Sequence, residues 1–299
     1  MQSTLARTVS CSGVGLHSGQ HTTVVLHPAP AGAGITFHRT DTGASVPALW
    51  DRVCATTLCT ALGSAAPPGG GREPVVGTVE HLMAALAAAR IDNLRIELDG
   101  PEIPILDGSA AAWMLLIDCA GRRQQHAPRR SIRVTRTVRV QHGDSWAQLD
   151  PGGHALSVSL GIDFASGAVG AQRVAFDGSE RDFRGELAVA RTFTFLGEVE
   201  AMRAAGLARG GSLDNAVVVD GDAVLNPGGN RYVDECVRHK ALDVVGDLAL
   251  AGAPIIGRFS GHRTGHRLNN QLLHALFADA AAWTVSGIPR HAVSHRRAA

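Results

Sequence analysis

The chain has 299 residues, 45% of them hydrophobic and 18% charged, so it can bury a sizeable core and disorder is not expected. Its 28 basic and 27 acidic side chains give a net charge of +1, and we therefore expect no nucleic-acid partner. The five cysteines are widely spaced and form no CxxC pair, which argues against a disulfide framework and against a four-cysteine zinc site.

Neither the N-terminus nor the apolar runs of the chain indicate a membrane protein. The segment MQSTLARTVS lacks the apolar run of a signal peptide. No stretch approaches the roughly eighteen consecutive apolar residues of a membrane-spanning helix. We therefore expect a cytoplasmic protein without a transmembrane segment.

The first half of the chain predicts both strands and helices. In chain order, these are a strand at 21–28, a helix at 79–90, a strand at 94–98 and a helix at 109–120. Thr78 is the expected N-cap of the first helix and Ser109 that of the second. The Gly/Pro-rich segment 65–73 is expected to form a surface loop.

The polar, Arg-rich segment 121–131 contains a proline and predicts a domain boundary. Beyond it we expect strands near 132–140, 145–149 and 155–162, helices near 179–189 and 197–205, a strand at 216–219, and helices near 231–251 and 267–281. Strands and helices occur mostly in runs, which favours two α+β domains over a doubly wound parallel sheet.

The predicted helix near 231–251 carries a candidate metal fragment. His239 and Asp243 are four residues apart and share one helical face, and Asp247, at about 80° from His239, continues the stripe. A His and a carboxylate at this spacing form a preorganised pair of metal ligands. The alternative is an amphipathic helix with a solvated polar face. Against it, Asp243 and Asp247 repel each other unless Lys240 or a metal supplies positive charge.

Two further fragments carry candidate site residues. Glu80 and His81 lie in the first turn of the helix at 79–90, where the positive helix terminus favours a carboxylate and a neutral, ligating imidazole. Glu80 can then act as a general base, although a helix-start Glu beside a surface His is the alternative. His266 follows Gly265 directly before a helix and can project into a cleft, or it can be a cap or surface residue.

Seven motifs occur in order: TVEHL, IDN, PEIPILDGSA, ARTF, GGSLDNAVVV, RHKALDVVGDL and TGHRLNN. Together they resemble the UDP-3-O-acyl-N-acetylglucosamine deacetylases of lipid A biosynthesis, over about residues 3–285. The resemblance implies two similar α+β domains, each a β-sheet layered against helices, with the active site at their interface. We place these domains at 1–125 and 126–299, with an insert near 197–226 that forms a passage for the acyl chain.

The resemblance further implies one catalytic zinc, held by His81, His239 and Asp243 with a fourth position open, as catalytic zinc sites require. It implies the catalytic residues as well: Glu80 takes a proton from water, Thr192 stabilises the oxyanion, His266 in its protonated form stabilises the tetrahedral intermediate, Asp247 orients His266, and Lys240 binds anionic substrate groups.

For the substrate, the resemblance implies that Phe164 stacks on uracil beside Asp163 and that Phe193 lines the cleft. Cys59, within the corresponding insert of the first domain near 52–77, also fits the family and is expected to be a substrate-binding residue; the alternative is a small buried hydrophobe. The expected partner is an acylated UDP-N-acetylglucosamine bound by a monomer, with acetate released. The alternatives are a metal-dependent amidohydrolase of another N-acetyl sugar and a zinc-stabilised binding protein with His266 as fourth ligand.

Overall fold

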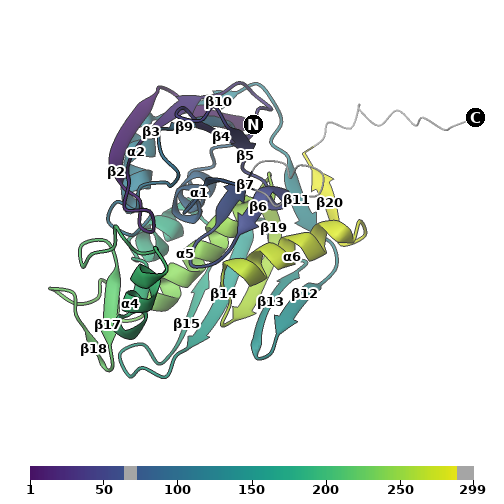
Figure 1. The fold of residues 1–299 in the computed structure, drawn as a ribbon. Coiled ribbons are helices and arrows are strands. Elements are labelled where there is room, and N and C mark those ends of the chain that lie inside the picture. The colour runs from purple at the N-terminus through teal and green to yellow at the C-terminus, as the bar shows by residue number, and fades with distance from the viewer. Residues whose placement is uncertain (64–72, 288–299) are drawn as a thin grey trace, which may run out of the picture.

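A computed structural model describes residues 1–63 and 73–287 of the chain. Two large β-sheets enclose a group of helices, so the fold is α+β, as predicted (Figure 1). All of the predicted loop 65–73 except Glu73 lies outside the described residues. Nothing in the structure tests the domain limits, so they stay a prediction.

Five strands of the first half form one sheet, in the order β2 (Val9–Val14), β3 (His21–Pro28), β9 (Leu94–Leu98), β4 (Ile35–Arg39) and β5 (Ser45–Pro47). β3 and β9 confirm the strands predicted at 21–28 and 94–98. Val24 is buried, whereas His27 and Glu97 on the other face bond to each other at 2.8 Å. The sheet therefore turns one face to the core.

Seven strands of the second half form the other sheet: β11 (Ser131–Val134), β12 (Val138–His142), β13 (Ser145–Asp150), β14 (Leu156–Asp163), β15 (Ala171–Phe176), β19 (Ile255–His262) and β20 (Trp283–Ser286). The structure confirms the strands predicted near 132–140, 145–149 and 155–162, the first as two strands, β11 and β12. The central strand β19 was not predicted from the sequence. A Cβ at its Gly257 would lie 2.9 Å from the carbonyl oxygen of Asp150, so no side chain fits there. Glycine at this buried position interrupts the apolar/polar alternation by which a strand is predicted from sequence.

Helices α1 (Glu80–Ala88) and α5 (Glu235–Ala249) pack directly against each other between the two sheets (Figure 1). α2 (Ala111–Ala120) packs on α1 and β2, and α6 (His266–Ala278) packs on α5, β12 and β13. A Cβ at Gly246 of α5 would lie 2.0 Å from the carbonyl oxygen of Glu80, so only glycine allows this approach of the two helices. The approach positions the candidate site.

Several predicted helix ends are corrected. Val79 is the N-cap of α1, so Thr78 is not; Thr78 has a φ of 55° and its hydroxyl donates to Glu102 at 2.7 Å. Ser109 lies one residue before the N-cap of α2, although its hydroxyl accepts from the Ala111 amide at 3.2 Å.

The remaining helices also differ from their predicted extents. The helix predicted near 231–251 begins only at Glu235, because residues 231–234 form bends and turns. The helix predicted near 267–281 ends at Ala278, and β20 follows it. The helix predicted near 179–189 is one turn, α3 (Glu180–Asp182), followed by the π-helical segment η2 (Phe183–Leu187).

Smaller elements complete the fold. β1 (Gln2–Leu5) pairs with β10 (Arg122–Gln125), which lies inside the predicted boundary segment 121–131. The region near 52–77 contains η1 (Trp50–Arg52), β6 (Val53–Ala55), β7 (Ala61–Gly63) and β8 (Pro74–Val76). The region near 197–226 contains α4 (Leu196–Ala204), β17 (Val217–Asp220) and β18 (Ala223–Val224), with β16 (Phe193–Phe195) just before it.

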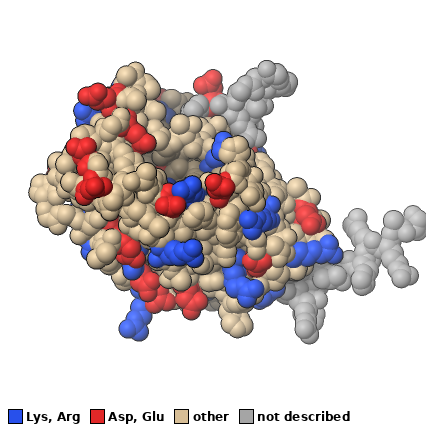
Figure 2. All heavy atoms as spheres, turned by 90° about the horizontal axis from the view of Figure 1, so that it is seen from below, with Lys and Arg blue, Asp and Glu red and all other residues tan. Residues whose placement is uncertain are grey.

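Across the described residues, no helix combines the length and the apolar character needed to cross a membrane. On the face drawn in Figure 2, Lys and Arg side chains occur together with Asp and Glu side chains, as a net charge of +1 leads one to expect.

Candidate metal centre

The structure brings together the three predicted metal ligands from two helices. His81 lies in the first turn of α1, and His239 and Asp243 lie one turn apart on α5. Their ligand atoms all lie within 4.8 Å of one another, and all three residues are buried. The Asp243 Oδ1 atom lies 3.4 Å from His239 Nε2 and 3.7 Å from His81 Nε2. The alternative of a solvated polar face on α5 is wrong, because these side chains face the helix–helix interface.

Asp243 shows that the group fits a cation. Its Oδ2 atom accepts a hydrogen bond from Lys240 Nζ at 2.7 Å, whereas its buried Oδ1 atom has no hydrogen-bond partner. A buried carboxylate oxygen without a partner is costly. A divalent cation between this oxygen and the two imidazole nitrogens would satisfy it, and two nitrogens with one carboxylate oxygen form a donor set typical of zinc.

Both histidines are in the neutral form that binds metal. Burial and, to a lesser degree, the neighbouring His239 lower the pKa of His81 to about 3. Burial also lowers the pKa of His239. The Nδ1 atom of His239 donates to the carbonyl oxygen of Ala190 at 3.1 Å, which leaves Nε2 as the free acceptor that faces Asp243.

Glu80 stands beside this group without belonging to it. Its carboxylate is 3% exposed, and burial raises its pKa to about 7. The Oε2 atom accepts from the Thr60 amide at 3.1 Å, and the Oε1 atom lies 3.8 Å from Nε2 of His266. A carboxyl group with a pKa near neutrality can both take and return a proton.

Asp247 fixes the orientation of His266. Its Oδ2 atom accepts from His266 Nδ1 at 2.9 Å and from Asn269 at 2.8 Å, while its Oδ1 atom accepts from the Thr60 hydroxyl at 2.6 Å. Burial acts to lower the pKa of His266, but the Asp247 carboxylate, with smaller contributions from Glu80 and Asp243, outweighs it, and the pKa rises to about 9. His266 is therefore protonated at neutral pH.

Sequence reasoning missed Thr60 and Asn269, which complete this network. Asn269 follows His266 by three residues in the TGHRLNN motif and lies on the same helical face, a spacing that could have indicated it. Thr60 is 187 residues from Asp247 in the chain, and no local pattern marks it.

A cavity of about 150 Å³ adjoins these groups. Its lining residues are Leu16, Leu58, Thr78, Glu80, His81, Thr192, Phe193, His239, Lys240, Asp243 and His266. Thr192 and Phe193 therefore lie beside the candidate ligands. Leu16 and Leu58 are additional apolar wall residues that sequence reasoning missed.

The other predicted substrate residues do not line this cavity. Phe164 packs against Phe193 and Phe195, with ring centroids at 5.7 and 5.3 Å. Asp163 is exposed and accepts from Arg263 at 2.9 Å. Burial and, to a lesser degree, Glu80 raise the pKa of the Cys59 thiol to about 12, so the thiol stays protonated.

A second buried network supports the segment that precedes Thr192. Glu235, at the start of α5, is fully buried and accepts from Arg191 Nε at 2.9 Å and from the Arg191 amide at 2.9 Å. The same segment provides the Ala190 carbonyl that holds His239. The pair therefore locks the backbone beside a candidate ligand.

Replacing Arg191 with alanine is expected to destabilise the protein by about 3–5 kcal/mol, because it leaves the buried Glu235 charge unpaired. Urea unfolding measures the change. The matched control is Arg184→Ala, which breaks two more exposed pairs, with Asp118 and Glu180, and should cost about 0–1 kcal/mol; the Arg184 side chain is 34% exposed. Equal losses in the two variants would contradict this reading of the buried pair.

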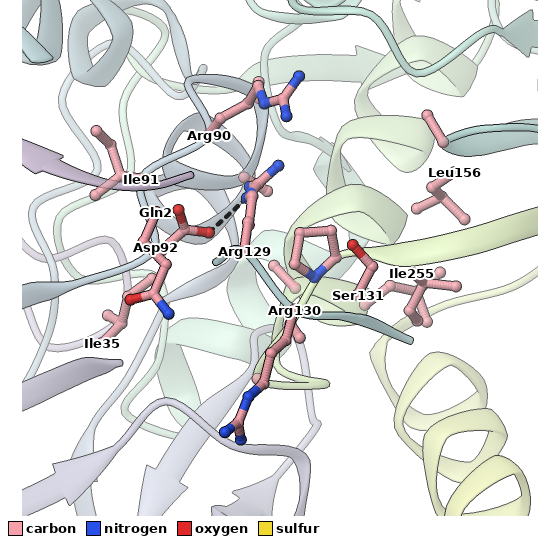
Figure 3. A pocket seen from close by; sticks show the side chains of 18 of the residues that line it. Gln2, Ile35, Arg90, Ile91, Asp92, Arg129, Arg130, Ser131, Leu156 and Ile255 are labelled. Carbon is pink, nitrogen blue, oxygen red and sulfur yellow. Dashed lines mark hydrogen bonds and ion pairs between the residues drawn. The ribbon is translucent and has the colours of Figure 1, made fainter. Parts of the chain in front are cut away.

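A larger cavity, of about 1100 Å³, lies elsewhere (Figure 3). None of the predicted site residues lines it. Two of the charged side chains in view are already paired, since Arg129 Nε donates to Asp92 at 2.6 Å. Chemistry rather than size therefore identifies the smaller cavity as the candidate active site.

Comparison with known proteins agrees with the motifs. The family model for UDP-3-O-acyl N-acetylglycosamine deacetylase (LpxC) matches residues 2–278. The chain belongs to this deacetylase family. A UDP-3-O-acyl-N-acetylglucosamine deacetylase of Myxococcus xanthus is 48% identical over 287 residues, which cover 95% of this chain and 88% of that protein.

Two other relatives carry the same name. The deacetylase of Phenylobacterium zucineum is 50% identical over 277 residues, or 92% of each chain. The deacetylase of Acidithiobacillus ferrooxidans is 49% identical over 286 residues, which cover 94% of this chain and 91% of that protein. Similarity to this deacetylase family thus covers nearly the whole chain, including every residue of the candidate metal centre.

Proposed function

We propose that this chain is a zinc-dependent hydrolase that removes the N-acetyl group from UDP-3-O-(3-hydroxyacyl)-N-acetylglucosamine and releases acetate, as a step of lipid A biosynthesis. The observation that carries the proposal is the buried group of His81, His239 and Asp243, with one unpartnered carboxylate oxygen, beside Glu80 and His266. The names of the relatives supply the substrate class.

Three protein ligands suit a catalytic rather than a structural metal, because structural zinc is usually held by four. When bound, zinc would supply Lewis acidity, which polarises the acetamide carbonyl and makes water more acidic. His266 is a poor fourth ligand, since its Nδ1 atom is engaged by Asp247 and its Nε2 atom faces Glu80. This arrangement speaks against a zinc-stabilised binding protein.

The proton steps fall to Glu80 and His266, whose Oε1 and Nε2 atoms lie 3.8 Å apart beside the candidate ligands. Glu80 accepts a proton at its carboxylate from the attacking water, for which a pKa of about 7 is suited. His266, protonated at neutral pH, stabilises the tetrahedral intermediate and donates from Nε2 to the leaving amine. The Thr192 hydroxyl, at the cavity wall, helps to stabilise the oxyanion.

The substrate body would extend from this cavity along two surfaces. Apolar side chains at the cavity wall, Leu16, Leu58 and Phe193, favour an acyl chain that runs toward the insert near 197–226. Phe164 with Asp163 is the proposed site for uracil. Lys240 Nζ donates to Asp243 Oδ2 at 2.7 Å. We propose that Lys240 keeps this bond while it binds anionic groups of the substrate.

Domains at 1–125 and 126–299, a monomeric state and a cytoplasmic location also belong to this proposal. The end of β10 at Gln125 and the start of β11 at Ser131 support the boundary.

A comparison of substrates tests the proposal against the alternative of an amidohydrolase for another N-acetyl sugar. Acetate release is measured with UDP-3-O-acyl-N-acetylglucosamine, with the same compound lacking the acyl chain, and with N-acetylglucosamine. The proposal expects turnover of the first and a large loss of kcat/KM for the others, since remote binding energy supports the chemical step. Equal turnover of all three would favour the alternative.

Replacing Asp247 with asparagine is expected to move the alkaline limb of the pH profile of kcat/KM to lower pH. The carboxylate is the main group that raises the pKa of His266, and Glu80 and Asp243 contribute less. Without it, burial lowers that pKa, so the protonated form is lost at a lower pH. Rates from pH 6 to about 10 measure the shift. An unmoved alkaline limb would show that protonated His266 is not required.

A further inference from the structure

Glu102 is a buried carboxylate that the proposed chemistry leaves unused. It is 3% exposed and belongs to the PEIPILDGSA motif. Its segment lies between two others: Glu102 forms a parallel bridge with Gly77, and Pro104 forms an antiparallel bridge with Gly15. The carboxylate is thus enclosed between the turn at 15–18 and the residues that lead into α1.

Hydrogen bonds from both segments converge on this carboxylate. From the turn, the amide of His17 donates to Oε1 at 2.9 Å and the amide of Ser18 donates to Oε2 at 2.7 Å. From the other side, the Thr78 hydroxyl donates to Oε1 at 2.7 Å. One side chain therefore ties together backbone segments that are about sixty residues apart in the chain.

The contact with Thr78 holds a strained residue next to the catalytic groups. Thr78 has a φ of 55°, which is unfavourable for a β-branched residue and persists only where its surroundings enforce it. Glu80 follows two residues later and His81 three residues later. The direction in which α1 begins thus depends on the conformation that Glu102 stabilises.

The turn on the other side of Glu102 forms a wall of the candidate cavity. Leu16 lines the cavity, and its carbonyl accepts from the Gly210 amide, in the insert, at 3.0 Å. A Cβ at Gly15 would lie 2.5 Å from Glu102 Oε2, and a Cβ at Gly210 would lie 2.2 Å from the Gly15 carbonyl oxygen. The turn is therefore packed closely between Glu102 and the insert.

We propose that Glu102 is a positioning residue that holds the apolar wall at Leu16 in register with the Glu80–His81 turn. The proposal rests on the proposed function, since it concerns the geometry of the same site. Glu102 acts through its hydrogen bonds rather than through its charge. A glutamine can reproduce all but one of those bonds. With its oxygen in the place of Oε2 it accepts from the Ser18 amide and from the His17 amide, which lies 3.2 Å from Oε2, and its amide donates to the Thr78 hydroxyl; only the bond from the His17 amide to Oε1 is lost.

This distinction makes the test specific. In Glu102→Ala, kcat is expected to fall by about 10²-fold, the effect of a displacement near 1 Å. In Glu102→Gln, the loss should stay within about tenfold, the value of roughly one hydrogen bond. The control is Glu97→Gln on the outer face of the first sheet, whose activity should equal that of the wild type. An equal loss in both Glu102 variants, or no loss in Glu102→Ala, would overturn the proposal.

Thr78→Val serves as a second variant, because valine has nearly the shape of threonine but cannot donate the 2.7 Å bond to Glu102. The variant also removes the hydrogen bond between the Thr78 side chain and Cys59. It should lower kcat more than it changes KM; an unchanged kcat would contradict the proposal.

Hydrogen exchange at the amides of His17 and Ser18 provides a readout that needs no turnover. Exchange should accelerate in Glu102→Ala and not in Glu102→Gln. A wild type without turnover would refute the proposed function, while unchanged exchange in Glu102→Ala would refute the positioning role.

Discussion

Replacing His239 with alanine is expected to remove the bound metal and to lower deacetylation by about 10³-fold or more, since Lewis-acid stabilisation of the transition state is worth several kcal/mol. The two remaining ligands, His81 and Asp243, come from different helices and make a weak site. Metal content after dialysis and acetate release measure the two effects together.

The matched control is His274→Ala. This exposed histidine of α6 packs edge-to-face with Trp50, and the two ring centroids are 4.6 Å apart. This variant should keep both its metal and its activity. A His239→Ala protein that retains about one metal ion per chain would show that the metal is held elsewhere.

Replacing Glu80 with glutamine is expected to lower kcat by about 10²- to 10⁴-fold while the metal content stays near one ion per chain. Glutamine keeps the acceptor for the Thr60 amide, which donates at 3.1 Å, but cannot take a proton. Glu80 also lies outside the group of three ligands, so metal binding should not change. Full activity would refute the role of Glu80 as base, and loss of the metal would assign it to the ligand set instead.

The candidate ligands could be predicted because helical geometry fixes them locally. His239 and Asp243 are four residues apart, and the same stripe continues to Asp247. The motifs, in their order along the chain, then joined this helix to His81 and His266 from distant segments. The spacing alone left a solvated helix face open, and only the packing of α1 on α5 excludes it.

The residues that hold these groups in place could not be predicted in the same way. Thr60 donates a hydrogen bond to Asp247, which is 187 residues away in the chain. Ala190 accepts from His239 through its backbone carbonyl, and the residue type at such a position does not reveal the bond. Gly246 is a further example, because its missing side chain allows the Glu80 carbonyl of α1 to approach α5 closely. This contact joins two distant elements, so no local sequence pattern predicts it.

The fold was predictable where burial leaves an alternation of side chains and unpredictable where it does not. β3 and β9 alternate clearly, and both were predicted with the correct ends. β19 is the centre of the second sheet, yet glycine occupies two of its buried positions. At Gly257 the Asp150 backbone lies too close for a side chain, and at Gly261 the Thr264 and Phe259 side chains fill the space. The short strand β20 forms only through its pairing with β11.

Metal removal and reconstitution test the central claim most directly. Acetate release from UDP-3-O-(3-hydroxyacyl)-N-acetylglucosamine is measured for the purified protein, for the protein stripped by a chelator, and after Zn²⁺ is added back. Turnover is expected to be lost on stripping and to return with about one zinc ion per chain. Metal-free protein that releases acetate at the full rate would contradict it.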